Sequence, residues 1–145
     1  MEPTRPKTIT VETKVDRPIA EVWTYWTDPS HIVKWNFAND DWCCPNAKNE
    51  LNAGGEFSWR MEAKDGSMGF DFNGKYSKVD PLKVIAGQIE DGRSMQVQFE
   101  DLGDKTLVTE IFEIEDTNTA EQQRGGWQSI LENFKRYAEG HSNNL

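Results

Sequence analysis

The spacing of hydrophobic positions changes twice along this chain. Between Thr8 and Val15 apolar and polar residues alternate, which predicts a strand with one buried face. Helical spacing follows, and Asp16 with Pro18 is expected to open this helix, whose buried stripe would consist of Ile19, Val22, Trp23 and Trp26. The motif Thr27-Asp28-Pro29 predicts a stop and a second short helix that ends near Trp35.

From Trp42 to Glu115 the chain alternates with the period of strands. The clearest strands are expected around Phe57–Met61, Phe70–Tyr76, Leu82–Ile89, Met95–Glu100 and Thr106–Ile114. Short turn motifs separate them: Asp65-Gly66-Ser67, Asp80-Pro81, Asp91-Gly92 and Gly103-Asp104. Strands joined by such short turns predict an antiparallel meander.

One long helix is predicted at the end of the chain. Thr119 and Gln122 have the spacing of a capping box, and Gly140 has the position of a left-handed C-terminal cap. Gly125 and Gly126 lie inside the helix, where they would allow close approach to the sheet or a bend. The apolar stripe of this helix consists of Trp127, Ile130, Leu131, Phe134 and Ala138, and it must pack on the sheet.

Length and charge narrow the functional class. A chain of 145 residues predicts a single domain over 1–145, with loose termini at 1–7 and 141–145. A net charge of -9 opposes binding to nucleic acid or to anionic membranes. Because no apolar segment resembles a membrane span or a signal peptide, a cytoplasmic location is expected.

Few residues suggest catalysis or metal binding. Cys43 and Cys44 are adjacent, which disfavours a disulfide, so reduced thiols on a strand are expected. His31 is expected at the surface and has no second histidine beside it in the folded region. The sequence therefore predicts no catalytic residues, no metal site and no cofactor.

Three carboxylates stand out because they lie within strands beside apolar residues: Asp71, Glu110 and Glu113. The simplest interpretation places them on the solvent side of the sheet. The alternative is that one or two point into a cavity, paired with Arg60 or Arg93, and orient a polar edge of a ligand.

Aromatic residues are unusually frequent, with six Trp, seven Phe and three Tyr. They would either fill a large core or line a cavity between the last helix and the sheet. The ligand-binding candidates on the strands are Phe57, Trp59, Met61, Phe70, Phe72, Tyr76, Met95, Val97 and Phe99. Those on the last helix are Trp127, Ile130, Leu131 and Phe134, and those closing one mouth are Trp35, Phe37 and Trp42. Trp127 and the irregular segment 35–42 are the preferred lining, because loops and element ends open more easily than the middle of a sheet.

The order of elements resembles a known family. The matching residues are Pro18, Val22, Trp23 and Trp26, then Thr27-Asp28-Pro29 with Trp35, then Gly54-Gly55-Glu56-Phe57, Met61 and Asp65-Gly66, and finally Gly126-Trp127 and Leu131. Over Ile9–Tyr137 the chain resembles the START-like (SRPBCC) superfamily, in the branch related to the activator of heat-shock-protein-90 ATPase. The resemblance implies an α+β helix-grip fold. A curved antiparallel sheet of six to seven strands would wrap around a long C-terminal helix, with two short helices after the first strand.

Three functions follow from these observations. The leading hypothesis is binding of an apolar, aromatic or lipid-like small molecule, which START-like relatives commonly bind. The second is a polyketide cyclase or aromatase, in which Tyr76, Glu110 and Arg93 would be the residues to mutate. The third is a co-chaperone domain with a protein partner, which the branch itself suggests.

Overall fold

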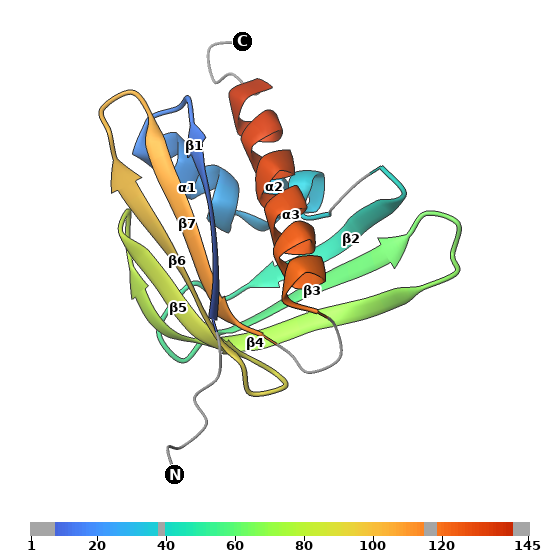
Figure 1. Ribbon diagram of the computed structural model, residues 1–145. Coiled ribbons are helices and arrows are strands. Elements are labelled where there is room, and N and C mark those ends of the chain that lie inside the picture. Colours follow the sequence, from blue (N-terminus) through green and yellow to red (C-terminus); the bar gives the residue numbers. More distant parts are fainter. Residues whose placement is uncertain (1–7, 38–39, 115–118, 141–145) are drawn as a thin grey trace.

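The computed structural model describes residues 8–37, 40–114 and 119–140, which form a seven-stranded antiparallel sheet and three helices (Figure 1). The strands are β1 (Thr8–Val15), β2 (Trp42–Asn49), β3 (Glu56–Ala63), β4 (Gly69–Asp80), β5 (Val84–Ile89), β6 (Ser94–Asp101) and β7 (Thr106–Glu113). The helices are α1 (Ile19–Thr27), α2 (Pro29–Trp35) and α3 (Ala120–Gly140). This is the α+β helix-grip arrangement that the order of elements predicts.

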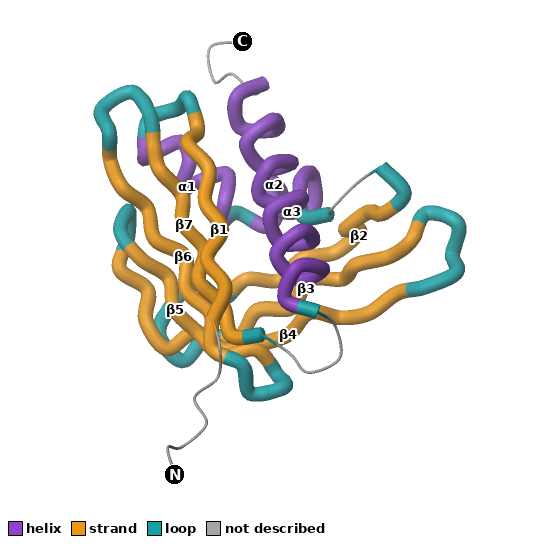
Figure 2. The backbone as a smooth tube through the Cα atoms, in the orientation of Figure 1, coloured by secondary structure: helices purple, strands orange, loops and turns teal. Residues whose placement is uncertain are grey.

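The sheet is a meander in which one strand is out of sequence order. The strand order is β1-β7-β6-β5-β4-β3-β2, so the first strand pairs with the last one. Thr8 lies opposite Glu113 and Val15 lies opposite Thr106 in that pair. Figure 2 shows that β2, β3 and β4 splay away from β1, β7 and β6, and that α3 lies in the angle between the two groups.

The two short helices lie between β1 and β2 in the sequence. Asp28 caps α2, because its carboxylate accepts a hydrogen bond from the Ser30 amide at 2.9 Å. The predicted cap of α1 is wrong: the N-cap residue is Pro18, which has no side-chain donor or acceptor, and the Asp16 amide instead donates to Glu139 on α3 at 2.8 Å.

The capping box of α3 is confirmed. The Thr119 hydroxyl accepts a hydrogen bond from the backbone N–H of Gln122, and the side-chain oxygen of Gln122 accepts one from the backbone N–H of Thr119, both at 3.1 Å. The predicted left-handed cap at Gly140 is wrong, since Gly140 is the last helical residue and its φ is not positive.

Two differences concern the strands. The predicted start of β5 at Leu82 is wrong, because Leu82 has a φ of 66° and lies in the turn that begins after Asp80. Trp42 is the first residue of β2, whose pairing with β3 shifts register between Cys43 and Asn46, and does not lie in an irregular segment. Gly92 has a φ of 99° at the tip of the β5–β6 hairpin, which agrees with the turn that Asp91-Gly92 predicts.

The core lies between the concave face of the sheet and the three helices. Its largest fully buried side chains include Tyr25, Phe57, Phe112, Phe134 and Leu131. The rings of Trp26, Trp35 and Phe134 meet there, with each of the three pairs of centroids 4.8 Å apart. This aromatic group fills the space at which α1, α2 and α3 converge.

Candidate functional site

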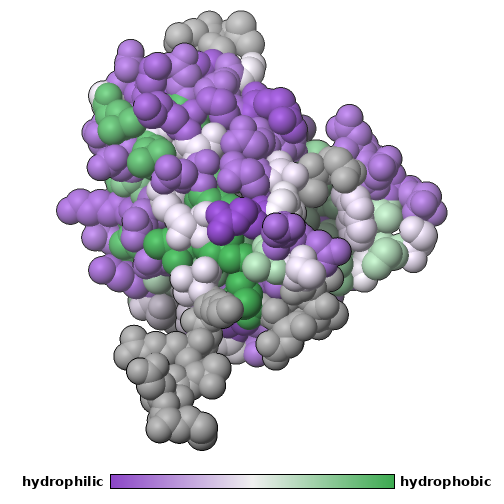
Figure 3. Space-filling model, viewed as in Figure 1, coloured by the Kyte–Doolittle hydropathy of each residue, from purple (hydrophilic) through white to green (hydrophobic). Residues whose placement is uncertain are grey.

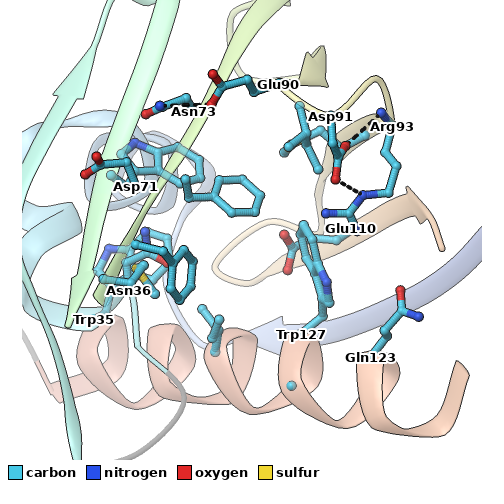
Figure 4. A pocket seen from close by; sticks show the side chains of 18 of the residues that line it. Trp35, Asn36, Asp71, Asn73, Glu90, Asp91, Arg93, Glu110, Gln123 and Trp127 are labelled. Atoms are coloured by element: carbon cyan, nitrogen blue, oxygen red, sulfur yellow. Dashed lines mark hydrogen bonds and ion pairs between the residues drawn. The ribbon is translucent and has the colours of Figure 1, made fainter. Parts of the chain in front are cut away.

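A cavity of about 640 Å³ lies between α3 and the concave face of the sheet. This volume falls within the range of small-molecule sites, which is roughly 300–1,000 Å³. Its lining residues come from β3, β4, β7, α3, the β5–β6 hairpin and the ends of α1 and α2: Trp26, Trp35, Asn36, Trp59, Met61, Phe70, Asp71, Phe72, Asn73, Ile89, Glu90, Asp91, Arg93, Met95, Glu110, Gln123, Gly126, Trp127 and Ile130. Figure 4 shows this space above α3, with Trp127 projecting into it from the helix.

Aromatic rings make two of the walls. On the β3–β4 side, Trp59 and Phe72 are stacked with centroids 5.5 Å apart and planes inclined by 2°. They face each other across the ladder, because Trp59 and Phe72 are register partners. On the other side, Trp127 stacks on Phe112 of β7 with centroids 4.0 Å apart. These rings are held by their neighbours, so the walls are formed before any ligand binds.

The structure brings half of the sequence-predicted lining residues to the cavity: Trp35, Trp59, Met61, Phe70, Phe72, Met95, Trp127 and Ile130. Phe70 marks the open side, since 47% of its surface is exposed. Six others are buried in the core instead of lining the cavity: Phe57, Tyr76, Val97, Phe99, Leu131 and Phe134. The last two, Phe37 and Trp42, are half-buried outside the lining, and Trp42 contacts Phe70 at a centroid distance of 6.1 Å.

Several lining residues were not among the sequence-predicted candidates. Helical periodicity could have identified Gln123, which lies one turn before Trp127 and is buried. Gly126 lines the cavity. A Cβ built on it or on Gly125 meets no atom within 4 Å, so the structure excludes close approach to the sheet, which was one of the two roles considered for this glycine pair. Others, such as Asn36 and Glu90, lie just after an element ends, where no periodic signal exists, whereas Trp26 lies in the buried stripe that helical spacing predicts for α1.

Glu110 is the buried acid of the site. It lies on the inner face of β7, and only 5% of its surface is exposed. Burial raises the pKa of its carboxyl from its usual value near 4.5 to about 8. Figure 4 shows this carboxyl pointing into the cavity beside Trp127. Of the two interpretations of the strand carboxylates, Glu110 therefore fits the cavity-facing one.

The other charged lining residues lie at the rim. Asp71 is exposed and pairs with Arg60 at 3.5 Å, as one of the suggested pairings expects. Arg93 pairs with Asp91 at 2.8 Å, and the side-chain amide of Asn73 donates a hydrogen bond to the Glu90 carboxylate at 3.1 Å. Glu113 accepts from the Ser94 amide at 2.6 Å and does not line the cavity. The rim is thus predominantly acidic.

Other sequence candidates lie away from the cavity. The Tyr76 hydroxyl donates to Asn49, and burial raises its pKa, so Tyr76 belongs to the core rather than to the site. His31 is half-buried, with Nδ1 2.5 Å from the Tyr137 hydroxyl. Cys43 and Cys44 are free thiols on β2, as expected. Within residues 8–37, 40–114 and 119–140, no group of three or more His, Cys, Asp or Glu side chains is arranged to hold a metal ion.

The surface seen in Figure 3 is mostly hydrophilic, and hydrophobic residues show only in limited patches. None of the helices in the described part of the chain combines the length and the hydropathy of a membrane-crossing segment.

Comparisons with known proteins agree with this architecture. The family model for Activator of Hsp90 ATPase homolog 1-like protein matches residues 16–139. The solution structure of an AHSA1-like protein from Aeromonas hydrophila is 41% identical, with a TM-score of 0.87, and the match covers 92% of this chain and 93% of that one. A protein from Cytophaga hutchinsonii is 45% identical, with a TM-score of 0.79 and coverage of 95% and 99%.

More distant structures share the fold. A protein from Chromobacterium violaceum is 20% identical, with a TM-score of 0.82 and coverage of 92% and 99%. The curated proteins contain no match to this chain. The family match over most of the chain and the two relatives above 40% identity agree with the helix-grip architecture, and the chain therefore belongs to the family of Activator of Hsp90 ATPase homolog 1-like proteins, within the START-like superfamily.

Proposed function

We propose that this protein binds an apolar, ring-containing small molecule in the cavity between α3 and the sheet. The observation that carries the proposal is the aromatic wall: Trp59, Phe72 and Trp127 line a space of about 640 Å³ and are braced by neighbouring rings. Stacking on such rings favours flat apolar molecules, and burial of their surface supplies the binding free energy.

The glycine pair of α3 supplies a matched test. Neither Gly125 nor Gly126 would meet another atom with a new Cβ, and only Gly126 lines the cavity. A leucine at position 126 is therefore expected to occupy ligand space, whereas a leucine at position 125 is expected to point elsewhere. Both substitutions also remove a helical glycine, so their effects on helix stability are similar.

The experiment titrates aromatic compounds, sterols and fatty acids into the protein and follows tryptophan fluorescence together with thermal unfolding. Saturable quenching by one chemical class, with a matching rise in Tm, is expected because a ligand stabilises the folded state. Gly126→Leu should weaken that binding by about tenfold or more, and Gly125→Leu should leave it near the wild-type value. Equal binding by both variants would place the ligand outside this cavity, and no response from any class would favour a protein partner instead.

A further inference from the structure

Two of the residues that line the cavity each have a buried polar atom without a hydrogen-bond partner among the described residues. They are the indole Nε1 of Trp59 and the carboxyl Oε1 of Glu110. By contrast, the buried indole of Trp35 donates to the Tyr25 carbonyl at 2.9 Å. Because nearly all buried polar groups in folded proteins are paired, these two unpaired groups at the same cavity are available for hydrogen bonds to a bound molecule.

The environment of Glu110 favours the neutral form of its carboxyl near pH 7. Its register neighbours are Val11 on β1 and Val97 on β6, and Val108 and Phe112 flank it on the same face of β7. All four are at most 2% exposed. Burial among these residues raises the pKa of Glu110 to about 8. In this form the carboxyl has a hydroxyl that donates a hydrogen bond.

The charged groups that share the cavity with Glu110 do not supply a counter-ion. On the β5–β6 hairpin, Arg93 is paired with Asp91 at 2.8 Å, and Glu90 adds a negative charge. On β4, Asp71 adds a further negative charge. The α3 residues that line the cavity, namely Gln123, Gly126, Trp127 and Ile130, are uncharged. An anionic ligand would thus meet carboxyl groups and no uncompensated cation among these lining residues.

The two unpaired atoms lie on different sides of the cavity. Trp59 is on β3 and Glu110 is on β7, and β4, β5 and β6 separate these strands in the sheet. Four strand spacings correspond to about 19 Å along the sheet, and the distance across the curled sheet is shorter. Each group therefore belongs to its own wall of the cavity, and a molecule with an oxygen at each end can accept a hydrogen bond from both.

We propose that Trp59 and Glu110 are the two polar ends of the cavity, and that the occupant is an uncharged ring compound with a hydrogen-bond-accepting oxygen at each end. This inference rests on the proposed function and adds the chemical class of its ligand. Trp59 donates from its indole N–H to one oxygen, and Glu110 donates from its protonated carboxyl to the other. A cationic ligand fits less well, because an ammonium group has no acceptor for the Trp59 N–H.

The test uses three matched probes that do not titrate: biphenyl, biphenyl with one para acetyl group, and biphenyl with a para acetyl group on each ring. Isothermal titration calorimetry near pH 7 is expected to show tighter binding with each acetyl group, by roughly three- to tenfold per hydrogen bond. Biphenyl carboxylate is expected to bind more weakly than biphenyl itself.

Three variants assign the two ends. Trp59→Phe keeps an aromatic ring without the N–H, and Glu110→Leu removes the carboxyl. Each should reduce the affinity for the diacetyl probe to about that for the monoacetyl probe. Glu110→Gln retains a donor, so it should keep the wild-type preference near pH 7.

The pH response tests the same assignment without relying on a disruptive variant. The wild-type affinity for the diacetyl probe should fall as pH rises through about 8, where Glu110 loses its donor proton. Glu110→Gln should show no such fall. Thermal unfolding of each variant confirms that it is folded under the titration conditions.

The outcomes separate this inference from the proposed function. Equal affinity for all three probes, lost in Gly126→Leu, would overturn the two polar ends while supporting an apolar binding cavity. Tighter binding of a biphenylmethylammonium cation than of the diacetyl probe would also overturn the uncharged class. No binding of any probe would overturn both proposals.

Discussion

At the scale of single residues, Glu110 lowers the free energy of unfolding by an amount that depends on pH and can be measured. An acid with a raised folded-state pKa binds its proton more tightly in the folded protein than in the unfolded chain. The unfolded chain releases the proton near pH 4.5, whereas the folded protein keeps it until about pH 8. The folded state is therefore destabilised progressively as pH rises between these two values, and the loss is complete above the upper one.

Glu110→Gln removes this titration while preserving the size and polarity of the side chain. We expect the variant to be more stable than the wild type near neutral pH, and nearly equal to it at about pH 4. The difference in the free energy of unfolding should grow between about pH 4.5 and 8 and reach roughly 2–5 kcal/mol. Urea unfolding of both proteins across this range measures it. A difference that does not vary with pH would mean that Glu110 titrates normally.

The sequence could identify Glu110 as unusual but not decide its orientation. Strand alternation places it with Thr106, Val108 and Phe112, which are all buried. The opposite face of β7, with Leu107, Thr109 and Ile111, is also partly buried and apolar, so polarity alone did not show which face was inside. For the same reason the aromatic positions were predicted as one set, although Phe57 and Tyr76 fill the core while Trp59 and Phe72 line the cavity.

At the scale of elements, α3 does more than cover the cavity. Its side chains Arg124, Gln128 and Lys135 donate to the carbonyls of Thr10, Glu12 and Lys14 on β1, at 3.2, 3.3 and 2.5 Å. Because β1 is an edge strand, these carbonyls have no neighbouring strand to pair with. The helix therefore protects the sheet edge from pairing with another chain.

Two glycines in different elements should respond oppositely to the same substitution. A Cβ at Gly74 on β4 would lie 2.3 Å from Phe57 and 2.5 Å from the Gln88 carbonyl, whereas a Cβ at Gly125 on α3 meets nothing. Gly74→Ala is expected to destabilise the protein by about 1–3 kcal/mol through overpacking. Gly125→Ala should stabilise it by about 0.5–1 kcal/mol by favouring the helix. Urea unfolding measures both, and a neutral Gly74→Ala would contradict the close packing of β4 on Phe57.

The elements themselves were largely predictable, because their signals are local. Alternation located β1 and the strands β3 to β7, and Thr119 with Gln122 located the start of α3. It did not give β2 as a separate strand, because the pairing of β2 with β3 shifts register between Cys43 and Asn46. The misplaced boundaries lie where local rules compete: Leu82 adopts a left-handed conformation in a turn, and the Asp16 amide is bound by Glu139, which is distant in sequence. The curvature that separates β3 from β7 by a cavity depends on the whole sheet and has no local signal.

At the scale of the whole molecule, the apolar core is continuous. One cluster of buried residues joins Val11 on β1, Val22 on α1, Phe57 on β3, Val97 on β6 and Phe134 on α3. No element in this group has a separate core of its own, and β1 pairs with β7 from the far end of the chain. Loss of any part should therefore remove support from the others.

We accordingly expect the chain to unfold as a single domain. Urea unfolding followed by tryptophan fluorescence, which reports the helix and sheet packing, should coincide with unfolding followed by far-ultraviolet circular dichroism, which reports the backbone. The calorimetric and van't Hoff enthalpies should agree as well. An early fluorescence transition would indicate that the packing around the tryptophans of the helices and of β2 and β3 is lost before the backbone unfolds. A probe that binds the cavity should move the single unfolding transition as a whole to higher urea concentration, because the cavity is lined by residues from both halves of the sheet and from α3.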